Sequence, residues 1–492
     1  MRTITIYTTL AVLLLTANTK AQEIRLTLDD AITMAADSSL SAIKAHRAYM
    51  SGYWEYRAYK AARMPSLTLN FTPAQYNRNI VQRYDSENDR DVFRTQQSYY
   101  ASGGLSVVQN VDFTGGTLYL NSGVDFLRSF GGDAYSQFSS VPVRIGYSQN
   151  LIGYNPFKWD KLIEPLKYER RIKELTYNME QISEEAIVYF FSFAQAQAEY
   201  ELAVKNQASC DTLYKIGCDR HKIGAISRAD LQTLKLDVIN ADNTLKNCEI
   251  AMRRAMFQLA SFLNIDKEQT LSIELPARPK LLTISAAKAL EYARENNPEF
   301  LALKQNILES RQAVDRTKKE SGINASLNAS IGFNQVGSEF AQVWRDPLQQ
   351  DMVSMSLSIP ILDWGVRKGR YNMARNNLTV VEISSRQSEQ QIEEEVVMTV
   401  NDFNVQGAMI ESAEEARLLA ESAYEDTRMR FIIGKSDINS LSMALTRKDA
   451  AEKNYISALR NYWLSYYKIR RLTMYDFTNE CTIDSGKDII KQ

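Results

Sequence analysis

The sequence predicts a mainly helical fold with a smaller β part, built by internal duplication. Three observations support this prediction. Residues 366–433 contain no proline, and their apolar positions return at steps of three and four, the spacing of a long helix that buries one stripe. The same pattern occurs once more, earlier in the chain. Between the long helical stretches lie segments that alternate apolar and polar residues, as strands do.

The duplication shows as one constant offset. Gly434 aligns with Gly224, which sets the offset at 210 (434 minus 224), and at that offset Phe403 aligns with Phe193 and Asp476 with Asp266. The register holds without a gap from position 366 to position 476. Both stretches are therefore predicted to be helical hairpins. Two equal hairpins in one chain imply quasi-equivalent neighbours in a repeated assembly.

The chain is predicted to divide at the following boundaries. A signal peptide, with Arg2 before an apolar run and a Thr19-Lys20-Ala21 cleavage site, takes residues 1–21. The first repeat, 22–281, holds a helix (27–63), a β region (66–151), a hairpin (155–266) and an irregular linker (267–281). The second repeat, 282–476, holds a helix (284–321), a β region (324–361) and a hairpin (366–476), and a polar, mobile tail (477–492) follows. Breaks are expected at Ser38-Ser39 and at Asn296-Asn297-Pro298.

The β regions are typical of membrane-crossing strands. Residues 324–333 and 353–361 place apolar side chains on one face and small, hydroxylated ones on the other, as the wall of a water-filled lumen would. The polar segments 76–97 and 129–140 are interpreted as external loops. A turn at 114–116 leaves the number of strands open at four or six, and a soluble β-sandwich stays open as an alternative. Four to six strands cannot enclose an open lumen alone, so the sequence calls for a ring of several chains.

Composition excludes several other classes of protein. Lys plus Arg number 58 against 59 Asp plus Glu, a net charge of −1, which argues against a nucleic-acid partner. There are two histidines, and the sequence has no zinc-finger spacing, nucleophile elbow or phosphate loop. We therefore predict no catalysis, no cofactor and no metal site. Cys210, Cys218, Cys248 and Cys481 are expected to be thiols packed in helices, with a bridge to Cys481 left open.

The chain resembles the TolC-type outer-membrane efflux protein family over nearly its whole mature length. The resemblance is carried by the duplication, by the openings LTLDDAITMA and ISAAKALEYARENNPEFLALK, and by the junctions ARMPSLTL and LSIPILDWGVRKG. The hairpin segments KIGAISRADLQTLKLDVINA and IIGKSDINSLSMALTRKDAAEKNYISALRNYW add to it. Each motif alone is weak, but their order and matched spacing are specific.

The resemblance implies a homotrimer with a transmembrane β-barrel, to which each chain gives a sector, in the outer membrane and an α-helical tunnel in the periplasm. It implies a passive outlet that docks onto a periplasmic membrane-fusion adaptor and an inner-membrane pump, or onto a type I secretion ABC transporter. Outer-membrane lipid would surround the barrel. The remaining alternative is a secreted structural coiled-coil protein of the cell envelope that has no pore. Neither the cargo nor the adaptor and pump follow from the sequence.

The resemblance also places the two hairpin turns at the periplasmic end, as docking and gating elements. The expected docking residues are Ile223, Gly224, Ala225, Ser227, Arg228, Ile433, Gly434, Lys435 and Ser436. The possible gate or lumen residues are Asp230, Phe431, Asp437, Ser440 and Met443. Known members carry acidic residues where this chain has Ser440 and Met443, and Phe431 has no hydroxyl for Asp230 to bind. Both glycines also suit ordinary helix ends.

Overall fold

The structure, a computed structural model, describes residues 24–130, 134–266, 271–433 and 435–483. It divides into two compact units. The helical unit comprises the described parts of Met1–Met50, Arg171–Phe300 and Glu389–Gln492, and the sheet unit comprises Ser51–Arg170 and Leu301–Ser388. Each unit draws on both sequence repeats. The predicted signal peptide, residues 1–21, lies outside the described residues.

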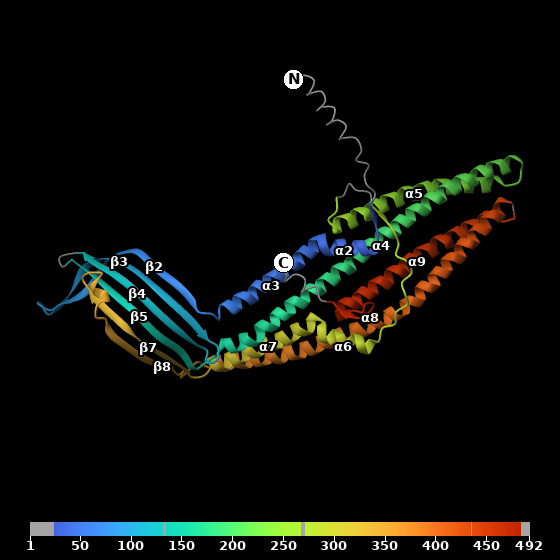
Figure 1. The fold of residues 1–492 in the computed structure, drawn as a ribbon. Coiled ribbons are helices and arrows are strands. Elements are labelled where there is room, and N and C mark those ends of the chain that lie inside the picture. The colour runs from blue at the N-terminus through green and yellow to red at the C-terminus, as the bar shows by residue number, and fades with distance from the viewer. Residues whose placement is uncertain (1–23, 131–133, 267–270, 434, 484–492) are drawn as a thin grey trace, which may run out of the picture. The chain divides into compact units, whose positions relative to one another are not determined.

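Two long helical hairpins provide most of the helical unit. The first is α4 (Pro156–Lys222) with α5 (Arg228–Phe262), and the second is α8 (Val366–Ile432) with α9 (Ile438–Thr473). They are drawn in green and in orange to red in Figure 1. Both α4 and α8 contain 67 residues, so the equality predicted from the offset is confirmed.

Shorter helices accompany each hairpin, and both predicted breaks are confirmed. The first pair is α2 (Leu28–Ser38) and α3 (Leu40–Ala61), and the second is α6 (Ala286–Asn296) and α7 (Pro298–Glu320). At the first break Ser39 Oγ accepts a hydrogen bond from Ala42 N, at 3.1 Å. At the second, Asn297 Oδ1 accepts one from Glu299 N, at 2.9 Å. These side chains satisfy amides that a new helix start leaves unpaired.

The core of the helical unit lies where α2 and α6 meet the hairpins. Phe190, Phe191 and Phe193 of α4 and Phe403 of α8 are all at most 1% exposed. Phe190 and Phe191 belong to a cluster that joins α2, α6, α8 and α9, while Phe193 packs with α5. Burying a side chain of this size contributes about 1.5–3 kcal/mol, so this region anchors both hairpins.

The sheet unit contains one antiparallel six-stranded sheet (Figure 1), in the order β2-β3-β4-β5-β7-β8. Its strands are β2 (Ser66–Asp85), β3 (Arg90–Val111), β4 (Gly116–Phe130), β5 (Tyr135–Ile152), β7 (Asn324–Gly337) and β8 (Leu348–Ser358). The open question of four or six strands is thereby answered as six. The β7–β8 connection includes a 3₁₀ turn, η1 (Gln342–Trp344).

Register separates the two faces of the sheet as the alternation predicts. Leu357, Met355 and Val353 of β8 pair with Ala325, Leu327 and Ala329 of β7, whereas the serines between them pair with polar residues. The apolar face is uncovered within the chain. Leu67, Leu69 and Phe71 of β2 are 67–70% exposed. A soluble sandwich would bury this face against a second sheet, so that alternative is wrong for the described residues.

Two segments interpreted as external loops are mostly strand. Residues 76–85 of β2 pair with 90–99 of β3. Strand β4 extends to Phe130, and β5 begins at Tyr135. Polar residues on both faces hide these strands from a search for apolar alternation, although the backbones pair regularly. The turn at residues 112–115 connects β3 to β4 and is held by two contacts. Arg63 forms an ion pair with Asp112, and Asn155 Nδ2 donates a hydrogen bond to Asp112 O at 3.2 Å.

Two further expectations need correction. The linker 267–281 is not wholly irregular, because β6 (Leu271–Ile273) pairs in parallel with β1 (Ile24–Leu26). The start of the polar tail is folded: β10 (Cys481–Thr482) pairs with β9 (Tyr475–Asp476), and Asp476 accepts hydrogen bonds from Thr478 N and Asn479 N. None of the helices in the described ranges is long and apolar enough to span a membrane.

Candidate functional site: the hairpin tips

The first tip is shaped by two helix-end motifs. Gly224 has a φ of +71°, and its N–H donates to His221 O at 3.0 Å while Ala225 N donates to Arg220 O at 2.8 Å. This is a Schellman ending of α4, which favours glycine because a side chain at positive φ is strained. At the start of α5, Ser227 Oγ accepts from Asp230 N, and Asp230 Oδ2 accepts from Ser227 N, both at 3.1 Å.

The second tip repeats this arrangement with two residues exchanged. Asp437, which aligns with Ser227, is the N-cap of α9, and Ser440, which aligns with Asp230, donates to it through N at 2.7 Å and Oγ at 3.0 Å. Lys435 N donates to Arg430 O at 2.8 Å, the equivalent of the Ala225 bond. Gly434 lies outside the described residues. Each tip thus retains one carboxylate and one hydroxyl in a helix cap.

The exposed surface of both tips carries isoleucine. Ile223 is 79% exposed and Ile433, its equivalent at the offset, is 63% exposed. Ala225, Ser227 and Arg228 are exposed as well, as is Lys435, while Ser436 is half-buried. Exposed apolar side chains ringed by polar ones are typical of a surface that binds a partner.

Asp230 and Phe431, which has no hydroxyl to offer, have separate partners in the described tips. Asp230 is occupied by the cap, where Ser227 Oγ also donates to its Oδ2 at 2.8 Å. Phe431 is buried in a cluster with Tyr424 and Leu441. The sequence held a signal for this, because a serine followed three residues later by an acid before a helix is a capping box.

The residue that links the two tips is Arg220, which sequence reasoning missed. Its Nη2 donates to Phe431 O at 3.3 Å and Ile432 O at 3.0 Å, and its guanidinium lies over the Phe431 ring, 5.6 Å from the centroid. A cation at the last carbonyls of α8 is favoured by the helix dipole. The available signal was that Arg220 aligns with Arg430 at the offset.

The remaining gate candidates are on the first turns of α9. Asp437 is exposed, and the hydrogen bond from Ser440 N, followed by that from its hydroxyl, lowers the pKa of Asp437. Met443 is 55% exposed, and Arg447 Nη2 lies 3.4 Å from its Sδ. No acidic side chain stands at either position 440 or 443. Asp437 lies beside Ser440 and is held by the cap.

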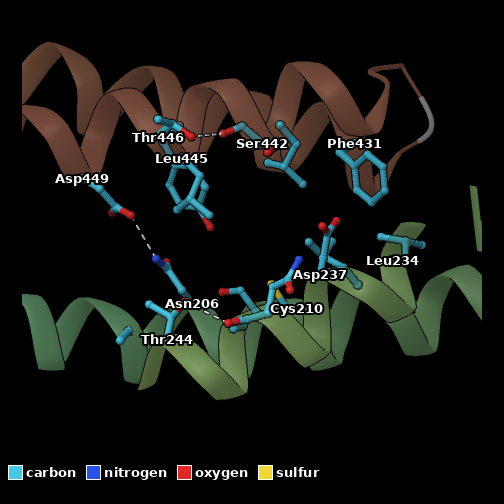
Figure 2. Close-up of a pocket in the computed structure, with 17 residues that line it drawn as sticks. Asn206, Cys210, Leu234, Asp237, Thr244, Phe431, Ser442, Leu445, Thr446 and Asp449 are labelled. Carbon is cyan, nitrogen blue, oxygen red and sulfur yellow. Dashed lines mark hydrogen bonds between the residues drawn. The ribbon is translucent and has the colours of Figure 1, made fainter. Parts of the chain in front are cut away.

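A cavity of about 390 Å³, lined by both polar and apolar side chains, lies beside the tips, between the two hairpins. Figure 2 shows Asn206 and Cys210 of α4 and Asp237 of α5 facing Ser442, Thr446 and Asp449 of α9. Asn206 Nδ2 donates to Asp449 Oδ2 at 3.1 Å, whereas Asp449 Oδ1 is buried without a protein partner. Burial raises the pKa of Asp237 and, against the effect of Asn206 and two nearby lysines, that of Asp449.

Farther from the tips, ion pairs join α4 to α9. Arg470 Nε and Nη2 each donate to Glu180 at 3.0 Å, and Arg471 Nε donates to Glu184 at 2.6 Å. Burial raises the pKa of Glu180 although Arg470 acts to lower it. The contact between α4 and α9 is therefore formed by largely buried ion pairs at one end and contains a cavity at the other.

The described residues contain no group of three or more His, Cys, Asp or Glu side chains placed to hold a metal. All four cysteines are free thiols, with Cys481 exposed and the others half-buried, so the possible bridge to Cys481 is not formed. Burial raises the pKa of the Cys210 and Cys248 thiols.

Residues 289–473 match the family model described as outer membrane efflux protein. None of the curated proteins matches the sequence significantly. The fold is similar to that of a membrane protein from Pseudomonas aeruginosa, at 16% identity and a TM-score of 0.65, with 91% of this chain and 90% of that one covered.

It is also similar to the Campylobacter jejuni outer membrane channel CmeC, at 11% identity and a TM-score of 0.66, covering 94% and 88% of the chains. The open state of the Neisseria gonorrhoeae outer membrane channel MtrE matches at 13% identity and a TM-score of 0.59, covering 91% and 88%. The second part of the chain thus matches the outer membrane efflux protein family, and the chain as a whole shares the fold of outer membrane channels.

Proposed function

We propose that three copies of this outer membrane efflux protein form a passive export duct from the periplasm to the exterior. The observation that carries the proposal is the six-stranded sheet, whose apolar face is exposed and whose outer strands, β2 and β8, have no neighbour within the sheet. In lipid such edges must be closed by further strands. Three sheets of six make eighteen strands, and barrels of 16–18 strands enclose an aqueous channel.

The helical hairpins would continue this duct as a tunnel in the periplasm, and the tips would dock onto a periplasmic membrane-fusion adaptor. The equivalent exposed isoleucines, Ile223 and Ile433, support a docking role for residues 223–228 and 433–436. The adaptor would connect the duct to an inner-membrane pump or to the ABC transporter of a type I secretion system. The apolar sheet face would contact outer-membrane lipid.

We further propose that Arg220 holds the closed state of the tips, because Phe431 has no hydroxyl with which Asp230 could hold it. Its bonds to the carbonyls of Phe431 and Ile432 join the ends of α4 and α8. Arg220→Ala would remove both bonds and the contact with the Phe431 ring, and thereby free the two tips from each other. Arg228→Ala, which removes an exposed tip arginine of the same charge, is the matched control.

The test is conductance in a planar bilayer, together with the native mass in detergent. The expected result is a trimer that forms discrete channels, with a larger open fraction for Arg220→Ala than for wild type or Arg228→Ala. Ser440→Asp and Met443→Asp would raise cation selectivity if the constriction lies at the second tip. An elongated, soluble particle that never forms channels would overturn the duct and favour the structural coiled-coil protein.

A further inference from the structure

The cavity between the hairpins has an apolar end and a polar end. The apolar end is formed by Phe431 of α8, Leu441 of α9 and Leu234 of α5, which are all at most 5% exposed. At the other end, Asn206 of α4 meets Asp449 of α9 (Figure 2). A ligand that fits this cavity therefore needs an apolar body and a polar group.

The fixed charge in the cavity is negative. The described residues that line it include two carboxylates, Asp237 and Asp449, and no lysine, arginine or histidine. Lys448 and Lys453 act on Asp449 from outside the lining, but their ammonium groups also pair with other carboxylates, at 3.7 and 3.1 Å. A cleft lined by one sign of charge attracts ligands of the opposite sign, so the cavity favours a cation.

Asp449 has hydrogen-bonding capacity that the described chain leaves unused. Asn206 Nδ2 donates to its Oδ2 at 3.1 Å, whereas its Oδ1 is buried and has no partner among the described residues. A buried acceptor without a donor is unfavourable, and an ammonium group would supply N–H donors together with a positive charge. Burial also raises the pKa of Asp449 and Asp237, as expected where the charge of a carboxylate is poorly compensated.

The size of the cavity favours an organic cation over a metal ion. A volume of about 390 Å³ lies within the range of small-molecule pockets. The side chains in the described ranges provide no group of three or more His, Cys, Asp or Glu residues placed to hold a metal. Around the rim, Asn240 and Thr244 of α5 and Ser442 and Thr446 of α9 are exposed, so a small molecule can enter from solvent.

We propose that this cavity binds a small organic ammonium ion with an apolar body. The ammonium group would donate to Asp449 Oδ1, with Asp237 as a second anion in the same cavity. The apolar body would pack on Phe431, Leu441 and Leu234. Such a ligand would touch both hairpins, so its binding would favour the arrangement in which they lie together. The site lies within one chain and does not depend on the proposed ring of copies.

Two natural cysteines report whether the cavity is occupied. Cys210 lines it and Cys248 does not, although both thiols are half-buried and burial raises the pKa of both. The rate at which iodoacetamide alkylates each cysteine in the purified chain, resolved by mass spectrometry, is measured against increasing phenethylammonium. Saturable protection of Cys210 is expected, with Cys248 unchanged.

Two further probes of nearly the same shape isolate the role of charge. Neutral phenethyl alcohol is expected to need a concentration about tenfold higher or more for the same protection of Cys210, because it lacks the charge-assisted hydrogen bond. Anionic phenylacetate is expected to give no protection. Equal protection by the ammonium ion and the alcohol would overturn the proposal, as would equal slowing of alkylation at Cys210 and Cys248.

A pair of variants identifies the carboxylate. Asp449→Asn keeps the shape of the side chain and is expected to raise the half-protecting concentration of phenethylammonium about tenfold, with little change for the alcohol. Asp242→Asn is the matched control, because Asp242 pairs with Lys246 at 2.7 Å and does not line the cavity. An unchanged alkylation rate at Cys248 would verify the fold of each variant. Unaltered protection in Asp449→Asn would overturn the site and leave the proposed duct standing.

Discussion

The two hairpins begin with helices of equal length and have similar tip geometry, but they differ in the surface that each offers to the other. The α4 side meets α9 through glutamates, arginines and an asparagine–aspartate pair. At the positions equivalent to Glu180 and Glu184, α8 has Gln390 and Glu394, whereas nearer the tip the same side of α8 presents alanines, a leucine and a valine. Because the backbones are equivalent, the difference lies in the side chains. It shows how one duplicated element can support two contacts with different properties, one formed within the chain and one left open.

The largest effect is expected at the ion pair between α4 and α9. Arg470→Ala would leave Glu180, whose side chain is 8% exposed, without its bidentate partner. Removing one partner of a buried pair costs about 3–5 kcal/mol of unfolding free energy. Denaturant unfolding would measure the loss. Gln390→Ala changes the exposed equivalent of Glu180 on α8, and a change above about 0.5 kcal/mol there would contradict the proposed difference between the surfaces.

A smaller effect is expected at the caps, where the hairpins are most alike. Ser227→Ala would remove the acceptor for Asp230 N and cost about 1 kcal/mol, seen as faster hydrogen exchange in the first turn of α5. The double variant Ser227→Asp with Asp230→Ser would install the arrangement of the second tip and is expected to restore slow exchange. If the double variant still shows fast hydrogen exchange in the first turn of α5, the two tips are not equivalent.

The smallest effect is expected from pH at the cavity, and its direction follows from burial. Asp449 and Asp237 have raised pKa values, so their contribution to stability is present below the ordinary value of 3.8 and is lost as pH rises through the raised values. Acidification within that window is expected to slow hydrogen exchange in residues 203–213 and 441–449, after correction for intrinsic rates. Because both groups are only partly buried, the gain stays below about 1 kcal/mol.

Asp449→Asn is the control for this pH effect. It keeps the shape of the side chain and removes its titration, so the exchange rates near the cavity should lose most of their pH dependence. A global unfolding measurement would not isolate the effect, because Asp476 has a lowered pKa and responds in the opposite direction. An unchanged pH dependence in Asp449→Asn would exclude this carboxyl as the source.

The parts that follow from the sequence are those governed by local spacing. The apolar period of α8, the break before Pro298 and the alternation in β7 depend on neighbouring residues, so the sequence alone predicts them. The strands in residues 76–97 do not follow from the sequence, because polar residues occur on both faces of that ribbon and only the pairing reveals the strands. Arg220 and the cavity depend on contacts between residues more than 200 positions apart. The docking roles of the tips stay predictions.

The open edges of the sheet bear on how the protein is made. Until the proposed assembly of copies forms, β2 and β8 expose unpaired backbone groups beside an apolar face, the feature that promotes edge-to-edge aggregation. A single chain is therefore the vulnerable species during biogenesis. Assembly has to outpace aggregation and proteolysis, so at high synthesis rates the yield should depend on the escort of newly exported chains and less on the stability of the finished fold.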